Sequence, residues 1–257
     1  MSKEYDAGKY MIGVDTHTHT ILSGHAWSTL AENVRAAKQR GMGALCLTEH
    51  GPRLVGGAPE YTPHSQRMVP PEVEGIRVYK GIEANILNPS GALDIPDKYL
   101  HITEFAIASF HALGGNGIVI GNEEENTSAY LKLMENPYID TIGHADDPGV
   151  PCDLETLVLA AKINGKLCEL NNNRIASGIY PSPRMKEYAL LCKKHDQRIC
   201  IGSDAHFYTM VGNVGDMMDL LASIDFPKEL IVNLTAERFA AYIEERKKRI
   251  RCDADAK

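Results

Sequence analysis

The chain has 257 residues, of which 44% are hydrophobic, and a formal net charge of −7. This length suits one large core, and a basic run occurs only at 246–251, which argues against binding to duplex nucleic acid. No apolar run reaches the roughly 18 residues that cross a bilayer, and residues 1–10 are polar. We therefore expect a cytoplasmic, single-domain protein (1–257, with a core at about 11–250) that binds small molecules and no membrane.

The six cysteines include no Cys-x-x-Cys pair. Cys46, Cys168 and Cys200 lie inside apolar runs, where a free thiol behaves as a small core residue. A reducing compartment is therefore expected. A thiolate metal site or a structural disulfide is the less favoured alternative, because the spacing does not fit a zinc finger.

Strand-like and helix-like runs alternate along the chain, as in parallel βαβ units. Thr29 and Glu32 form a capping-box pattern that predicts a helix ending near Gly41. Asp153 is the expected N-cap of a helix that ends at Gly165, and Pro183 is expected to begin another helix. Further helices are predicted at about 126–135, 211–223 and 235–249, the last with Phe239, Tyr242 and Ile243 facing inward. The predicted strands are 11–15, 43–50, 76–83, 105–111, 139–144, 166–171 and 198–203.

Seven parallel strands without a repeat of fixed period predict a closed or nearly closed α/β barrel. A doubly wound open sheet is the alternative. No Gly-x-Gly-x-x-Gly turn follows the first strand, so a dinucleotide-binding fold is disfavoured. The Gly- and Pro-rich stretch 51–71 is predicted to be a long loop.

Residue types that bind metals gather at the ends of the predicted strands. His17 and His19 are two residues apart, so their imidazoles point to the same side. Because the carboxyl ends of the strands form one rim of a βα barrel, side chains that follow different strands can meet there. Such crowding without cations would bury unsatisfied polar groups, whereas divalent ions satisfy them. The other candidates are His25, His50, Glu83, His111, His144, Asp204 and His206.

Each of these histidines taken alone also fits a hydrogen-bonded polar residue in a turn. His64, His101 and His195 fall in loops or a helix, away from the strand ends, and are not expected to bind metal. The joint pattern favours a metal centre.

The order of the motifs resembles the polymerase and histidinol phosphatase (PHP) superfamily, and within it the stand-alone phosphatases similar to the bacterial YcdX protein. The resemblance runs from about Ile12 to Glu244. The matching segments are Asp-Thr-His-Thr-His (15–19), a histidine six residues on, Thr-Glu-His-Gly-Pro (48–52), Gly-Ile-Glu (81–83), Ser-Phe-His (109–111), Ile-Gly-His (142–144) and Gly-Ser-Asp-Ala-His (202–206).

The resemblance implies a distorted (βα)7 TIM-like barrel with three divalent metal ions at its mouth. The first ion would be held by His17, His19, Glu83 and Asp204. The second would share Glu83 and take His111 and His144. The third would be held by His25, His50 and His206. Glu49 departs from the aspartate usual in the family, which puts the orientation of His50 and the third site in doubt.

Such a cluster suits hydrolysis of a small phosphate monoester. Two ions about 3.5 to 4 Å apart can bridge a hydroxide that attacks phosphorus, with Glu83 as the bridging ligand. Glu83, Asp204 and His206 are the predicted catalytic residues. Imidazole and carboxylate ligands suit zinc, which we expect, and manganese or iron are the alternatives.

Asn171 and Arg174, just beyond the sixth predicted strand, and Arg53 are candidate substrate contacts. A polar turn is the alternative interpretation of the run 171–174. A homo-oligomer is compatible with the sequence.

Three other functions compete. An amidohydrolase-type C–N hydrolase also begins with His-x-His, but it gives no joint role to His25, His50 and His206. A nuclease or phosphodiesterase lacks support from a polymerase domain or a basic groove, so no stable nucleic-acid partner is expected. A metal-binding protein without activity is the third.

Overall fold

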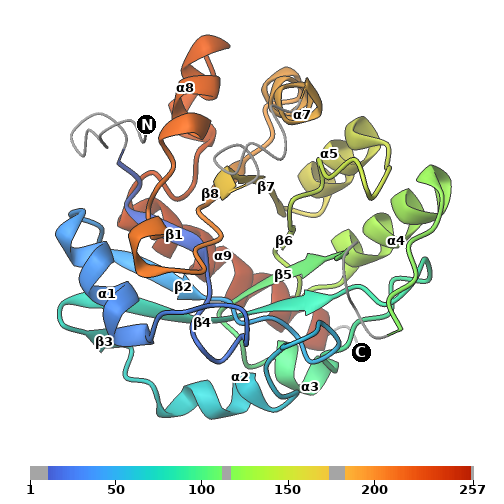
Figure 1. Cartoon of the computed structure of the whole chain (residues 1–257). Helices are drawn as coiled ribbons and strands as arrows, with labels where there is room; N and C mark the ends of the chain where they lie inside the picture. The colour runs from blue at the N-terminus through green and yellow to red at the C-terminus, as the bar shows by residue number, and fades with distance from the viewer. Residues whose placement is uncertain (1–10, 112–116, 174–182, 256–257) are drawn as a thin grey trace.

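Seven parallel strands form one curved sheet with helices around its outer face (Figure 1). The computed structural model describes residues 11–111, 117–173 and 183–255. The predicted TIM-like (βα)7 barrel is confirmed: the sheet curls until its first and last strands meet. In spatial order the strands are β1 (Val14–Thr18), β2 (Ala44–Leu47), β4 (Ile76–Asn85), β5 (Phe105–Ser109), β6 (Thr141–Ile142), β7 (Leu167–Asn171) and β8 (Ile199–Gly202), and β3 (Glu72–Val73) pairs antiparallel to β4.

Helix ends follow the local capping signals. Thr29 and Glu32 form the predicted capping box, and Asp153 accepts a hydrogen bond from the backbone of Thr156, as expected of an N-cap. The fourth helix begins at Glu123, three residues before its predicted start, because Asn122 and Glu125 form a second capping box. The helices are α1 (Leu30–Gln39), α2 (Thr62–Ser65), α3 (Asp97–Leu100), α4 (Glu123–Glu135), α5 (Leu154–Ile163), α7 (Pro183–Lys194), α8 (Gly215–Ser223) and α9 (Ala236–Asp255).

Several other predictions of element bounds are wrong. The first strand covers 14–18 instead of 11–15, which places His17 inside the strand. Helix α8 begins at Gly215 instead of 211, because a 3₁₀ turn at 208–210 and the left-handed Gly212 precede it. The stretch 51–71 is not a plain loop, since it contains α2 and a 3₁₀ turn.

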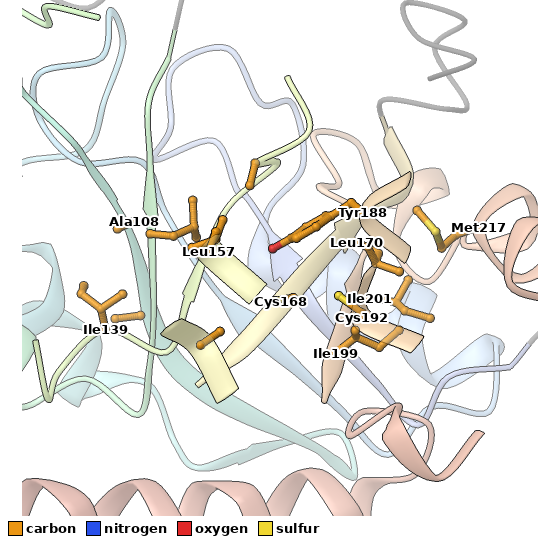
Figure 2. Close-up of a cluster of buried hydrophobic side chains, with 14 of the residues drawn as sticks. Ala108, Ile139, Leu157, Cys168, Leu170, Tyr188, Cys192, Ile199, Ile201 and Met217 are labelled. Atoms are coloured by element: carbon orange, nitrogen blue, oxygen red, sulfur yellow. The ribbon is translucent and has the colours of Figure 1, made fainter. Parts of the chain in front are cut away.

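Strand residues alternate between two apolar cores. The barrel-interior core lies inside the sheet, and Phe239, Tyr242 and Ile243 of α9 close it from one end, as predicted for the inward face of this helix. Figure 1 shows α9 crossing behind the strands. The outer core lies between the sheet and the surrounding helices, and Figure 2 shows the part formed by β7, β8 and side chains of α5, α7 and α8. The strand residues of the barrel-interior core are Val14, Ala44, Cys46, Tyr79, Phe105, Ile107, Leu167 and Cys200.

The seam between β1 and β8 is closed mostly by side chains. Asn233 donates to the carbonyl oxygens of Val14 and Ile201, at 2.8 and 2.7 Å, and accepts from the amide of Ile201 at 3.0 Å. The buried carboxylate of Asp15 accepts hydrogen bonds from the backbone amide and hydroxyl of Ser203. These contacts join the first and last strands of the barrel wall.

All six cysteines are free, and Cys46, Cys168 and Cys200 are buried as expected. Within the described residues, no helix combines the length and apolar character that a membrane span requires.

Candidate metal centre

A β-bulge in β1 aims the first two histidines at the barrel mouth. Asp15 pairs with Leu45 and Thr18 pairs with Leu47, so two residues of β1 stand opposite one residue of β2. In a regular ladder, His17 would pair with Leu47 and point to the outer core. The extra residue reverses the alternation, and His17 faces the interior instead. His19 follows on the same side.

Glu83 lies at the centre of the cluster. It is on the inward face of β4 and fully buried, and neither carboxylate oxygen receives a well-aligned hydrogen bond from a described residue. Imidazole nitrogens surround it. Its Oε1 lies 3.3 Å from Nε2 of both His111 and His144, and its Oε2 lies 2.5 Å from Nδ1 of His50. A fully buried carboxylate is costly unless positive charge compensates it, which protonated imidazoles or a bound metal ion can supply.

Asp204 completes a second face of the cluster. Its Oδ1 lies 3.1 Å from Nε2 of His19 and 3.6 Å from Nε2 of His17. The same two nitrogens lie 3.7 and 3.4 Å from Oε2 of Glu83. The nitrogens of His17 and His19 and an oxygen of Glu83 lie within 4.8 Å of one another, as the donors of one ion would. The arrangement brings together the residues implied for the first ion.

A third face is formed by rings. The His25 ring centroid lies 4.8 Å from that of His50 and 4.7 Å from that of His206, and Nε2 of His50 lies 3.3 Å from Nε2 of His206. His50 thus has one nitrogen toward Glu83 and the other toward His206. Nitrogens of His19, His50 and His206 also lie close enough together to bind one ion. The three implied ligand sets are therefore not separate in space.

Protonation of the imidazoles differs across the cluster. Burial holds the pKa of His50 at about 4, and burial together with His50 and His206 holds the pKa of His19 well below its ordinary value. Burial opposes protonation of His17 as well, but the carboxylates of Glu169, Asp204 and Glu83 raise its pKa well above the ordinary value. Neutral rings such as His19 and His50 present lone pairs to a metal at neutral pH.

The backbone at two candidate ligands is left-handed. His144 has a φ of 34° and Asp204 a φ of 52°, a conformation that non-glycine residues rarely adopt. Such strain is characteristic of functional sites, where the surrounding structure enforces it. Gly202 shows how tight the packing is, since a Cβ there would lie 2.5 Å from Cβ of His17.

Glu169 is a site residue that the sequence interpretation missed. It lies on the inward face of β7, fully buried, and its Oε1 accepts a hydrogen bond from Nδ1 of His17 at 2.6 Å. Its Oε2 accepts from the backbone amide of His144 at 2.8 Å. The hydrogen bond between Glu169 and Nδ1 of His17 directs Nε2 of His17 toward Glu83. The only sign of this role in the sequence was the position of Glu169 inside an apolar stretch predicted to be a buried strand.

The predicted substrate contacts are placed differently from one another. Asn171 is buried and donates to Oδ2 of Asp204 at 3.3 Å, so it contacts a candidate ligand. Arg53 is exposed on the loop after β2, and its backbone amide donates to Asp94 at 2.9 Å. Arg174 lies outside the described residues.

Glu49 contacts the loop that carries His25. The buried carboxylate accepts from the hydroxyls of Thr20 and Ser23, at 2.5 and 2.6 Å, and from the backbone amide of Thr20. The Ser23 hydroxyl in turn accepts from the backbone amide of His50 at 3.0 Å. The residue that departs from the family pattern therefore links the His25 loop to His50 through backbone and hydroxyl groups.

The remaining histidines are away from the cluster, as predicted. His64 is exposed on α2, and His101 follows α3 and packs against Tyr138. His195 follows α7 and lies 2.7 Å from a carboxylate oxygen of Glu155.

The family of the chain that carries this cluster is given by a match to a family model. Residues 15–250 match the family model described as PHP domain. The chain belongs to the PHP domain family. This confirms the resemblance found in the sequence, and the matched span contains the seven histidines and two carboxylates of the cluster.

Relatives of this PHP domain protein support the assignment over most of the chain. A protein of Acetivibrio thermocellus called "Probable phosphatase" is 42% identical over 238 residues, covering 93% of this chain and 98% of the relative. A "Probable phosphatase" of Caldanaerobacter subterraneus subsp. tengcongensis is 37% identical over 245 residues, covering 94% and 95%.

A solved structure shares the fold of this PHP domain. It is a histidinol phosphate phosphatase from Lactococcus lactis subsp. lactis, complexed with zinc, L-histidinol and phosphate. The TM-score is 0.57 at 18% identity, with 84% of this chain and 94% of the other covered. At this identity the likeness concerns the barrel.

Proposed function

We propose that this PHP domain is a metal-dependent phosphohydrolase that cleaves small phosphate monoesters. The observation that carries the proposal is the buried Glu83 carboxylate, whose oxygens receive no well-aligned hydrogen bond from the described residues and are ringed by imidazole nitrogens. The enzyme class, a hydrolase of phosphoric esters, is confirmed by family membership and by relatives named as phosphatases.

The donor set fits three divalent ions. His17, His19, Glu83 and Asp204 would hold the first ion. Glu83, His111 and His144 would hold the second, and His25, His50 and His206 the third. Orphaned buried donor atoms support this fit: within the described residues, Nε2 of His17, Nδ1 of His50 and both oxygens of Glu83 have no hydrogen-bond partner.

Zinc is the proposed metal, with manganese or iron as alternatives. The donors are imidazoles and carboxylates without thiolates, a set that all three ions accept. The Lactococcus lactis relative in fold was solved with zinc, which supports the first choice.

When bound, the ions would supply an activated water as nucleophile and positive charge that stabilises the phosphoryl group during its transfer. The protein side chains fix the geometry. Glu83 reaches two faces of the cluster with separate oxygens, which suits a bridging ligand. Glu169 keeps the proton of His17 on Nδ1, and Asn171 restrains the carboxylate of Asp204. Glu83, Asp204 and His206 are the proposed catalytic residues.

Elemental analysis of the purified protein combined with phosphatase assays tests the proposal. We expect more than two equivalents of transition metal and release of phosphate from small monoesters. Chelation should abolish turnover, and added zinc, manganese or iron should restore it. Faster hydrolysis of single-stranded DNA than of monoesters would support the nuclease alternative instead. Full metal occupancy without turnover on any ester would contradict the proposal.

We also propose that the protein is cytoplasmic and that a small phosphorylated substrate is its main partner.

A further inference from the structure

Large apolar side chains are exposed beside the histidine cluster. Trp27 is 77% exposed and Ile21 is 59% exposed, and Leu22, Phe207 and Tyr208 are also exposed. Single exposed apolar residues are normal, but contiguous groups of them mark binding sites. We call the five residues Ile21, Leu22, Trp27, Phe207 and Tyr208 the aromatic rim.

Hydrogen bonds join the two segments that carry the aromatic rim, residues 21–28 and 206–208. The amide of Trp27 donates to the carbonyl of His206 at 2.8 Å, and the amide of Tyr208 donates to the hydroxyl of Ser28 at 2.8 Å. The amide of Ile21 donates to the carbonyl of Ser28 at 2.9 Å. The rings of Phe207 and Tyr208 are in contact, with centroids 4.6 Å apart. The two segments, far apart in the sequence, therefore lie side by side in the structure.

The aromatic rim is continuous with the third face of the cluster. His25 lies two residues before Trp27, and His206 directly precedes Phe207. The rings of His25 and His206 are themselves 4.7 Å apart, and both are accessible. A phosphate ester whose phosphoryl group lies at the cluster therefore has the aromatic rim within reach of its organic group.

We propose that the aromatic rim binds the planar aromatic group of the phosphate ester, so that this PHP domain prefers aryl esters to small alkyl esters. This inference rests on the proposed function, because the phosphoryl group must lie at the histidine cluster. Aromatic side chains bind planar rings by burying large apolar areas with favourable ring geometry. Aliphatic neighbours such as Ile21 and Leu22 add apolar area without any charge that a polar organic group would need.

Trp27 provides a direct reporter, because it is the only tryptophan in the chain. Phenylphosphonate and methylphosphonate have a phosphorus–carbon bond in place of the ester linkage, so a phosphatase does not hydrolyse them. The two compounds differ only in the organic group. We expect phenylphosphonate to change the tryptophan fluorescence of the metal-loaded protein with saturation, and methylphosphonate to change it little at equal concentrations. Inorganic phosphate should reverse the phenylphosphonate signal by competing for the cluster.

Two variants sharpen the experiment. Phe207→Ala should weaken phenylphosphonate binding about tenfold, the effect of losing one aromatic contact. Ile163→Ala is the matched control: Ile163 is 83% exposed at the end of α5, just before β7, and so at the opposite end of the barrel. It should bind phenylphosphonate as the unaltered protein does.

Kinetics give a second test. The ratio of kcat/KM for phenyl phosphate to that for methyl phosphate should fall about tenfold in Trp27→Ala and stay constant in Ile163→Ala. The two esters have different leaving groups, but this difference is the same in every variant. It therefore cancels when the ratio is compared between variants.

Several results would overturn the inference. A phenylphosphonate signal that phosphate does not reverse, or an unchanged ratio in Trp27→Ala, would do so. A dimer that Trp27→Ala converts to a monomer would assign the aromatic rim to a contact between two copies. Absence of hydrolysis of every ester, together with phosphate-reversible phenylphosphonate binding, would instead refute the proposed function and leave the aromatic binding site intact.

Discussion

Glu169 accepts a hydrogen bond from His17 across the barrel interior, 2.6 Å from Nδ1 to Oε1, with both side chains fully buried. A carboxylate on the far nitrogen fixes the tautomer and ring orientation of a metal-binding histidine and raises its basicity. His17 therefore depends on a residue of β7 that is not itself a candidate ligand.

Glu169→Gln tests this dependence. Glutamine keeps the shape but loses the charge that polarises His17. We expect the affinity for metal to fall about 10- to 100-fold, measured by titration against a competing chelator. Glu155→Gln is the control, because Glu155 is partly exposed on α5, away from the cluster, and pairs with Lys194 and His195. Equal affinities in the two variants would show that Glu169 has only a packing role.

Removal of a proposed ligand should separate activity from folding. His17→Ala and Asp204→Asn should each lower kcat/KM by at least about a hundredfold, because the proposed first ion loses a ligand. Both residues lie at the barrel mouth outside the two apolar cores, so circular dichroism and thermal unfolding of the metal-free variants should remain native-like. His195→Ala should keep full activity, and a comparable loss in that variant would refute the assignment of ligands.

Glu49→Asp concerns the loop that carries His25. The shorter carboxylate cannot reach the hydroxyls of Thr20 and Ser23 together, so His25 should lose its fixed position. We expect metal content to fall by about one equivalent, with the other ions retained. Glu135→Asp, at the exposed end of α4, should leave the content unchanged. Full occupancy in Glu49→Asp would mean that His25 is positioned without this carboxylate.

Lys166 should make stability depend on pH. It is buried at the end of the barrel opposite the mouth, and its Nζ donates to the carbonyls of Asn136 and Ile139. Burial lowers its pKa to about 7, and Arg249 adds to the effect. Between this value and the ordinary lysine pKa of 10.5, the unfolded chain holds a proton that the folded chain lacks, so stability from this group rises with pH.

Urea unfolding between pH 7 and 10 measures this contribution. We expect Lys166→Met to flatten the rise in the free energy of unfolding across that range. Lys162→Met should keep it, because Lys162 is exposed on α5. An unchanged slope in Lys166→Met would indicate that Lys166 stays protonated in the folded protein.

Local signals allowed prediction of much of the fold. Capping by Thr29 and Asp153 depends on neighbours three residues away, and most of the candidate ligands lie close to the ends of predicted strands, so both could be predicted from local sequence. Asn122 offered the same kind of signal and was overlooked.

Features set by pairing between distant segments could not be predicted. The bulge that turns His17 inward exists only in register with β2, and a single sequence does not specify that register. The contact between Glu169 and His17 joins residues 152 positions apart. The role of Glu49 likewise depends on how the His25 loop folds back over β2.

The seam between β1 and β8 also governs when the centre can assemble during synthesis. His19 and Asp204 are 185 positions apart, so the first of the proposed ligands leave the ribosome long before the last ones. A nascent chain that stops before β8 lacks Asp204 and His206. It also lacks Asn233, whose hydrogen bonds join β1 to β8, so its barrel wall stays open. Ion capture should therefore be a late, post-translational event, and truncated chains released before β8 should retain markedly less metal than the complete protein.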